Sequence, residues 1–77
     1  MNTGHEPRRP SWRCGSCGDE WPCPDRRREL TAEFTGHRAA LALYLARHLS
    51  DALLDHPGTA ESLLYQRFLG WLPNRQR

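Results

Sequence analysis

The stretch "CGSCGDEWPCP", residues 14–24, decides how this chain can fold, because it holds all three cysteines of the sequence. Cys14 and Cys17 are separated by two residues, and each is followed directly by glycine, as in a zinc knuckle in which backbone N–H groups approach the sulfurs. Cys23 adds a third thiolate after five intervening residues. The spacing therefore predicts a metal site, and Zn²⁺ is the ion that fits it best.

Other uses of the cysteines fit the sequence less well. Three cysteines cannot form two disulfides, and no stretch has the pattern of a signal peptide, which favours a cytosolic protein over a secreted disulfide framework. A thioredoxin-like redox pair needs a βαβ context, and the sequence shows no strand signal. An iron–sulfur cluster is closer in chemistry, but the gap before Cys23 differs from the common ferredoxin spacing. Asp19, Glu20 and the prolines make the segment a poor apolar core.

The fourth ligand has several candidates among the four histidines. We favour His5, which lies in the same irregular segment nine positions before Cys14. His37, at a helix junction, and His48, on the apolar side of a predicted helix, remain alternatives. His56 precedes a proline in a turn and is expected to face solvent.

The composition predicts a small, mostly α-helical domain. The chain has 77 residues, eleven Leu and eleven Arg, and no Val, Ile or Lys. Strands prefer β-branched residues, whereas Leu, Ala and Arg favour helices. The core of so small a domain supplies little stability, so we expect a bound metal ion to add to it. No apolar run approaches the roughly 20 residues that span a bilayer, so we expect no membrane segment and a soluble protein.

Apolar periodicity and helix stop signals divide the chain near Pro24. Residues 1–24 should form an irregular metal loop, without helix or strand, packed on about three helices. The helical region is predicted over 25–72, with Pro24 opening the first helix. Its pattern predicts helices over 24–34, 37–55 and 60–72, ended by glycine or by the "HPG" turn. Residues 73–77 are left as a tail, so that 1–77 forms a single zinc-binding helical domain.

Two tryptophans and an arginine run stand next to the cysteines. Trp12 and Trp21 are expected to pack between the metal loop and the helices. The alternative is that they form an exposed surface that recognises a partner. Arg26, Arg27 and Arg28 could pair with carboxylates or grip phosphates, although such runs are usually solvated. Together these five residues are the predicted contact region for a partner, and Arg67 is expected to be exposed.

The residues also resemble a family of small actinobacterial proteins. The resemblance rests on "PSWRCGSCGDEWPCP", "ALYLARHLSDAL" and "LLYQRFLGWL", with His5 and Pro7 matching an opening His-x-Pro element, and it covers almost the whole chain. It implies that Cys14, Cys17 and Cys23 are ligands and adds support for His5. Some members carry a flavin-reductase label. This chain, however, has no Gly-rich phosphate-binding turn and is too short for a dinucleotide-binding fold.

The net charge helps to decide between protein binding and nucleic-acid binding. The formal net charge of +2 falls to +1 when Zn²⁺ adds two charges and three thiolates remove three, which is a weak footprint for nucleic acid. Four protein ligands leave no open position for catalysis. We therefore predict a non-enzymatic module with a structural Zn²⁺ that binds another protein. The alternative is a nucleic-acid-binding regulator resembling a zinc finger, and the third reading is a redox or iron–sulfur protein associated with flavin chemistry.

Overall fold

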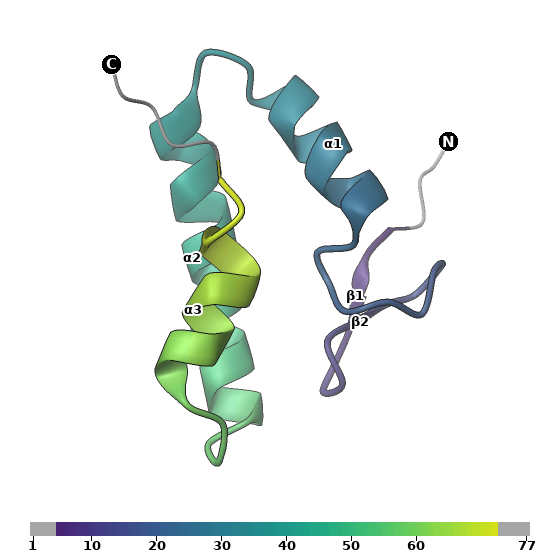
Figure 1. Cartoon of the computed structure of the whole chain (residues 1–77), viewed down its shortest axis with the longest axis vertical. Coiled ribbons are helices and arrows are strands. Elements are labelled where there is room, and N and C mark those ends of the chain that lie inside the picture. Colours follow the sequence, from purple (N-terminus) through teal and green to yellow (C-terminus); the bar gives the residue numbers. More distant parts are fainter. Residues whose placement is uncertain (1–4, 73–77) are drawn as a thin grey trace.

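The computed structural model describes residues 5–72 and confirms the small, mostly α-helical fold. Figure 1 shows two short strands followed by three helices. In chain order these elements are β1 (Pro7–Arg8), β2 (Arg13–Cys14), α1 (Pro24–Glu33), α2 (Arg38–Asp55) and α3 (Glu61–Leu69). The predicted tail, 73–77, lies outside the described residues.

The expectation of a loop without strands before Pro24 is wrong in one respect. β1 and β2 form an antiparallel pair in which Pro7 is opposite Cys14 and Arg8 is opposite Arg13. Each strand has only two residues, whereas alternation becomes a readable strand signal only over about four or more. The hairpin is therefore set by the contacts around it and not by strand propensity.

The three helices lie close to their predicted positions. α1 begins at a proline directly after Cys23, where a missing N–H costs nothing, and a turn through Gly36, at a φ of 81°, follows it. α2 ends at Asp55, immediately before the predicted turn. α3 is shorter than predicted, because it ends at Leu69 and the chain turns at Gly70. Among residues 5–72, no helix is long and apolar enough to cross a membrane.

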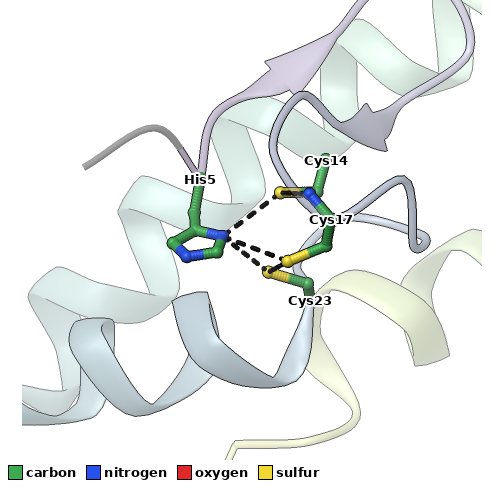
Figure 2. A group of neighbouring side chains, drawn as sticks. All are labelled: His5, Cys14, Cys17 and Cys23. Carbon is green, nitrogen blue, oxygen red and sulfur yellow. Dashed lines mark hydrogen bonds between the residues drawn. The ribbon is translucent and has the colours of Figure 1, made fainter. Parts of the chain in front are cut away.

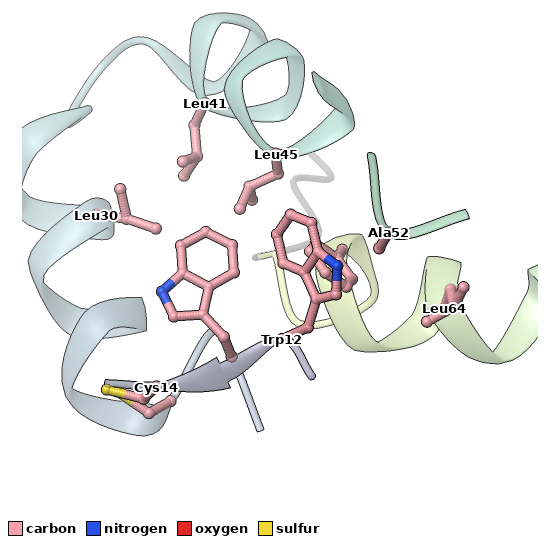
Figure 3. Packing of buried hydrophobic residues seen from close by; sticks show 10 residues of the cluster. Trp12, Cys14, Leu30, Leu41, Leu45, Ala52 and Leu64 are labelled. Atoms are coloured by element: carbon pink, nitrogen blue, oxygen red, sulfur yellow. The ribbon is translucent and has the colours of Figure 1, made fainter. Parts of the chain in front are cut away.

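α2 and α3 form a helical hairpin, and α1 and the β-hairpin lie to one side of it (Figure 1). Between these parts the core is built around Trp12 and Trp21, which are the two largest fully buried side chains. Figure 3 shows leucines of α1 and α2 pointing toward the indole rings. The buried cluster comprises Trp12, Cys14, Trp21, Cys23, Leu30, Leu41, Leu45, Ala52, Leu64 and Phe68.

Candidate metal centre

The predicted ligands converge on one point. The Nδ1 atom of His5 lies 3.3 Å from the Sγ of Cys14 and 3.4 Å from the Sγ atoms of Cys17 and Cys23. The Sγ atoms of Cys17 and Cys23 are 3.9 Å apart. Figure 2 shows the three sulfurs on one side of the imidazole ring. The cysteines form no disulfide, and all four ligand atoms lie within 4.8 Å of one another, so the group can hold a metal ion.

These separations match the edges of a small coordination tetrahedron. Bonds of about 2.3 Å to sulfur and about 2.0 Å to nitrogen give tetrahedral edges of about 3.8 Å between sulfurs and about 3.5 Å between sulfur and nitrogen. The observed edges of 3.9 Å and 3.3 to 3.4 Å are close to these values. The ligand atoms are therefore spaced for one ion bound by all four side chains.

The ligands come from four places along the chain. His5 precedes β1, and Cys14 is the last residue of β2. Cys17 lies in the tight turn that follows, which is closed by a bond from the N–H of Gly18 to the carbonyl of Cys14. Gly18 has a φ of 79°, a conformation that costs glycine little. Cys23 lies at the N-cap position of α1, directly before its first residue, so an ion held here would join the β-hairpin to the first helix.

The three thiols are not equivalent when no cation lies between them. Burial raises the pKa of the Cys14 thiol, but N–H donors from the Cys17 and Ser16 backbone and the His5 ring outweigh it, and the pKa falls to about 6. Burial and the neighbouring sulfurs of Cys23 and Cys14 raise the pKa of the Cys17 thiol to about 12. The cluster resists ionising all its thiols, and a divalent cation would remove that resistance.

The His5 ring is oriented from both sides. Its Nδ1 faces the sulfurs, and the hydrogen bond to Cys14 raises the pKa of the imidazole despite partial desolvation. Its Nε2 faces the carboxylate of Asp25 at 3.8 Å. A metal-binding histidine commonly has an acceptor of this kind beyond its second nitrogen. The structure therefore brings His5, favoured from its position in the sequence, into the site.

The other histidines lie outside the cluster. His37 is exposed before α2. His48 packs its ring on Trp21 at 4.9 Å between centroids and donates from Nδ1 to the Tyr44 carbonyl, as a core histidine does. His56, expected to face solvent, is half-buried, and it makes a contact that the sequence did not indicate: its Nε2–H donates to the Pro10 carbonyl at 2.6 Å and fastens the β-hairpin to the end of α2.

The tryptophans do not form an exposed contact region. Trp12 is 1% exposed and Trp21 is fully buried, and both rings contact Phe68 of α3 at centroid distances of 5.5 and 5.8 Å. The Nε1–H of Trp21 donates to the His5 carbonyl. The packing role between metal loop and helices is therefore the one that the structure shows, and the aromatic recognition surface is wrong, since large rings fill the gap that short helices leave.

The arginine run is divided among different contacts. Arg26 bonds Glu29 and the Tyr44 hydroxyl and is mostly covered. Arg27 donates to the Pro22 carbonyl and lies over the ring of Trp71. The side chain of Arg28 is 72% exposed and pairs with Asp25. Residues 26–28 therefore do not present one continuous basic surface, because successive helix positions point about 100° apart.

Three charged residues that fasten the metal loop to the helices were not singled out as such in the sequence. Asp55 accepts two bonds from Arg9, at 2.9 and 3.0 Å, and one from the Nε1–H of Trp12 at 2.7 Å. Arg67, expected to be exposed, donates to the carbonyls of Trp21 and Trp12. These contacts join residues 43 to 55 positions apart. No local pattern in the sequence indicates contacts between residues so far apart.

Comparison with known proteins finds no matching family model, no matching curated protein and no matching solved structure. The resemblance to the small actinobacterial family therefore remains a prediction.

Proposed function

We propose that the chain is a non-enzymatic zinc module in which one structural Zn²⁺ is held by His5, Cys14, Cys17 and Cys23. The observation that supports this best is the set of ligand separations, 3.3 to 3.4 Å from nitrogen to sulfur and 3.9 Å between two sulfurs. Three thiolates and one imidazole are soft and borderline donors, a set that suits Zn²⁺ and not Mg²⁺ or Ca²⁺.

A single ion fits this cluster better than an iron–sulfur cluster does. Iron–sulfur clusters distribute their protein ligands over separate irons, which sets those ligand atoms farther apart than one shared ion does. Here all four lie within 4.8 Å of one another. The compact arrangement therefore favours a mononuclear site.

The role of the ion would be structural. All four tetrahedral positions are taken by side chains, which leaves no place for a water or substrate. The ligands flank both buried tryptophans in the chain, since Trp12 lies between His5 and Cys14 and Trp21 lies between Cys17 and Cys23. By fixing the segment at four points, the ion would hold the two indoles in the core.

We further propose that the module acts by binding protein. Its support is the surface that remains once the core is built: four large apolar side chains are more than half exposed, all on α2 and α3, namely Leu43, Leu54, Leu63 and Tyr65. Side chains of this size offer apolar area that a protein partner would bury. The basic contacts that would favour nucleic acid are mostly paired within the chain.

Metal analysis of protein purified without added metal tests the site. We expect one zinc per chain, no visible absorption band, and a metal-bound NMR pattern at the Nδ1 of His5. His5→Gln should weaken zinc binding strongly, whereas the matched His37→Gln variant should bind zinc as the parent does. Iron with a visible chromophore, or equal zinc affinity in both variants, would refute the assignment.

Capture from a native cell extract, repeated with nuclease and at raised salt, tests the binding role. A protein partner with an apolar contact should survive both treatments, because counterion release makes phosphate contacts far more salt-sensitive. Recovery of only nuclease-sensitive material would favour the nucleic-acid alternative instead.

A further inference from the structure

The three cysteine ligands differ in their exposure to solvent. Cys14 is 2% exposed and Cys23 is fully buried, whereas Cys17 is exposed. Cys17 lies in the tight turn after β2, and apart from the neighbouring residues no atom lies within 4 Å of where a Cβ at Gly18 would stand. The turn is therefore open to solvent beside Cys17, and Cys17 is the cysteine that a small molecule in solution reaches first.

The sulfurs also differ in their hydrogen bonds. The Sγ of Cys14 accepts the backbone N–H groups of Ser16, at 3.4 Å, and of Cys17, at 3.3 Å. In the part of the chain that the structure describes, the Sγ of Cys17 lies against His5 Nδ1 and the Sγ of Cys23 and accepts no backbone N–H. An N–H donor draws negative charge from a thiolate and weakens it as a nucleophile. Cys17 therefore carries a more nucleophilic sulfur than Cys14 does.

A second sulfur lies within reach of Cys17. The Sγ of Cys23 is 3.9 Å away, and a disulfide brings two sulfurs to about 2 Å. Figure 2 shows these two sulfurs side by side. Cys23 is fixed at the start of α1, whereas Cys17 belongs to an exposed turn that can supply the movement. Cys17 can therefore react first with a reagent from solution, and Cys23 can react second with Cys17.

We propose that Cys17 is a modification site for peroxides, and that its oxidation to a disulfide with Cys23 releases the bound ion. The proposal rests on the metal site proposed above and gives that site a regulation in addition to its structural role. The reagent is a small hydroperoxide, of which hydrogen peroxide is the simplest, because the Cys17 sulfur lies against the other ligand atoms and leaves room for a small molecule.

Hydrogen peroxide is the oxidant in both steps of the reaction. The Cys17 sulfur attacks one peroxide oxygen, so that an S–O bond forms, the O–O bond breaks, and the leaving hydroxide takes up a solvent proton to give water. The Cys23 thiolate then attacks the Cys17 sulfur, so that an S–S bond forms, the S–O bond breaks, and a second hydroxide leaves and becomes water. The two sulfurs lose two electrons and the peroxide gains them.

The disulfide would leave too few ligands to hold the ion. A thiolate is the form of cysteine that binds metal, so Cys14 and His5 alone would remain. Residues 5–23, which carry the two largest buried side chains, would then lose their anchor. Oxidation should therefore loosen the core and stop any binding that requires the folded module, and a thiol reductant with zinc should reverse the change.

Treatment of the zinc-loaded chain with one equivalent of hydrogen peroxide tests the proposal. We expect zinc release, followed with a colorimetric indicator, to proceed in step with the loss of two thiols. Fragmentation mass spectrometry should place the disulfide between Cys17 and Cys23. With less than one equivalent of maleimide, Cys17 should carry at least about ten times as much label as Cys14 or Cys23.

A pair of variants separates the reactive sulfur from the rest of the site. Cys17→His removes that sulfur and keeps four ligands, since two cysteines and two histidines also form closed Zn²⁺ sites. It should slow the release of zinc by peroxide at least about tenfold. Asp19→His is the matched control, because it puts the same side chain on the same turn at an exposed position that is not a ligand, and it should release zinc as the parent does.

The outcomes distinguish this proposal from the metal site on which it rests. A parent chain that holds one zinc but is labelled first at Cys14 or Cys23, forms its disulfide with Cys14, or keeps its zinc in peroxide overturns the redox role alone. A parent chain that binds no zinc overturns both. If Cys17→His binds no zinc, the labelling and the disulfide position in the parent decide.

Discussion

The segment before α1 and the α2–α3 hairpin are ordered by different kinds of interaction. In residues 5–23 regular structure is limited to four strand residues and an isolated bridge between Arg13 and Glu20. The segment is held by four converging ligands and by side-chain hydrogen bonds to residues far along the chain. In α2 and α3 each backbone bond is local and the apolar residues recur with helical spacing. The first region therefore depends on a few long-range contacts, and the second on many short-range ones.

The two regions nevertheless share one core. The largest buried side chains, Trp12 and Trp21, come from the irregular segment, and they fill the space against Leu30 of α1, Leu45 of α2 and Phe68 of α3. Without the indoles the core would lose its two largest side chains, which contact Phe68 of α3. The stability of the helices is thus conditional on a segment that has almost no regular structure of its own.

Removal of the metal should have the largest effect, because it should destabilise both regions. Structural zinc contributes of order 10 kcal/mol to folding in small zinc domains, more than a domain of this size can spare. We expect a chelator, or Cys23→Ser, to abolish the cooperative thermal transition and to reduce helical content, measured by circular dichroism. Returning zinc to the parent chain should restore both.

The opposite outcome would separate the regions. If the helical signal survived chelation while only tryptophan fluorescence moved toward that of solvated indole, the α2–α3 hairpin would be stable by itself. The helices would then not depend on the N-terminal segment for their stability.

Truncation of one indole tests how far the helices depend on the N-terminal segment, without changing a metal ligand. Trp21 is fully buried between His48 and Phe68, so Trp21→Ala should cost about 3 to 5 kcal/mol of unfolding free energy. Leu54→Ala, at a side chain that is 77% exposed on α2, should change it by no more than about 0.5 kcal/mol. Urea unfolding of the zinc-loaded chains measures both. Equal effects would show that the indole is not part of the core.

The contrast between the regions also explains what could be predicted from the sequence. The helices and the three cysteines are local signals, and each lies where its spacing indicated. His5 required a choice among four histidines, which its place in the irregular segment and the resemblance to the small actinobacterial family favoured. The strands of the β-hairpin have two residues each, too few for a readable alternation. The bonds made by Asp55, His56 and Arg67 join residues more than 40 positions apart. The exposed recognition surface considered for Trp12 and Trp21 is wrong, because their burial is decided by helices that come later in the chain.

The smallest expected effect concerns the contacts that Asp55 makes at the end of α2. Hydrogen bonds from Arg9 and from the Nε1–H of Trp12 lower the pKa of the Asp55 carboxyl from its ordinary 3.8 to about 2. Trp12 has a φ of 59°, unusual for a bulky residue, and this bond helps to hold it there. Asp55→Asn should therefore lower the melting temperature by less than Trp21→Ala does.

The matched variant Asp51→Asn should change the melting temperature least, because Asp51 reaches Arg9 only at 3.9 Å and is half exposed. The direction with pH follows from the lowered pKa of Asp55. Its stabilisation is complete above the unfolded value of 3.8 and is lost as pH falls toward about 2. Between about pH 5 and about pH 8 the melting difference between the parent and Asp55→Asn should stay constant. A melting difference that changed within this pH range would contradict the assignment of the stabilisation to the Asp55 carboxylate.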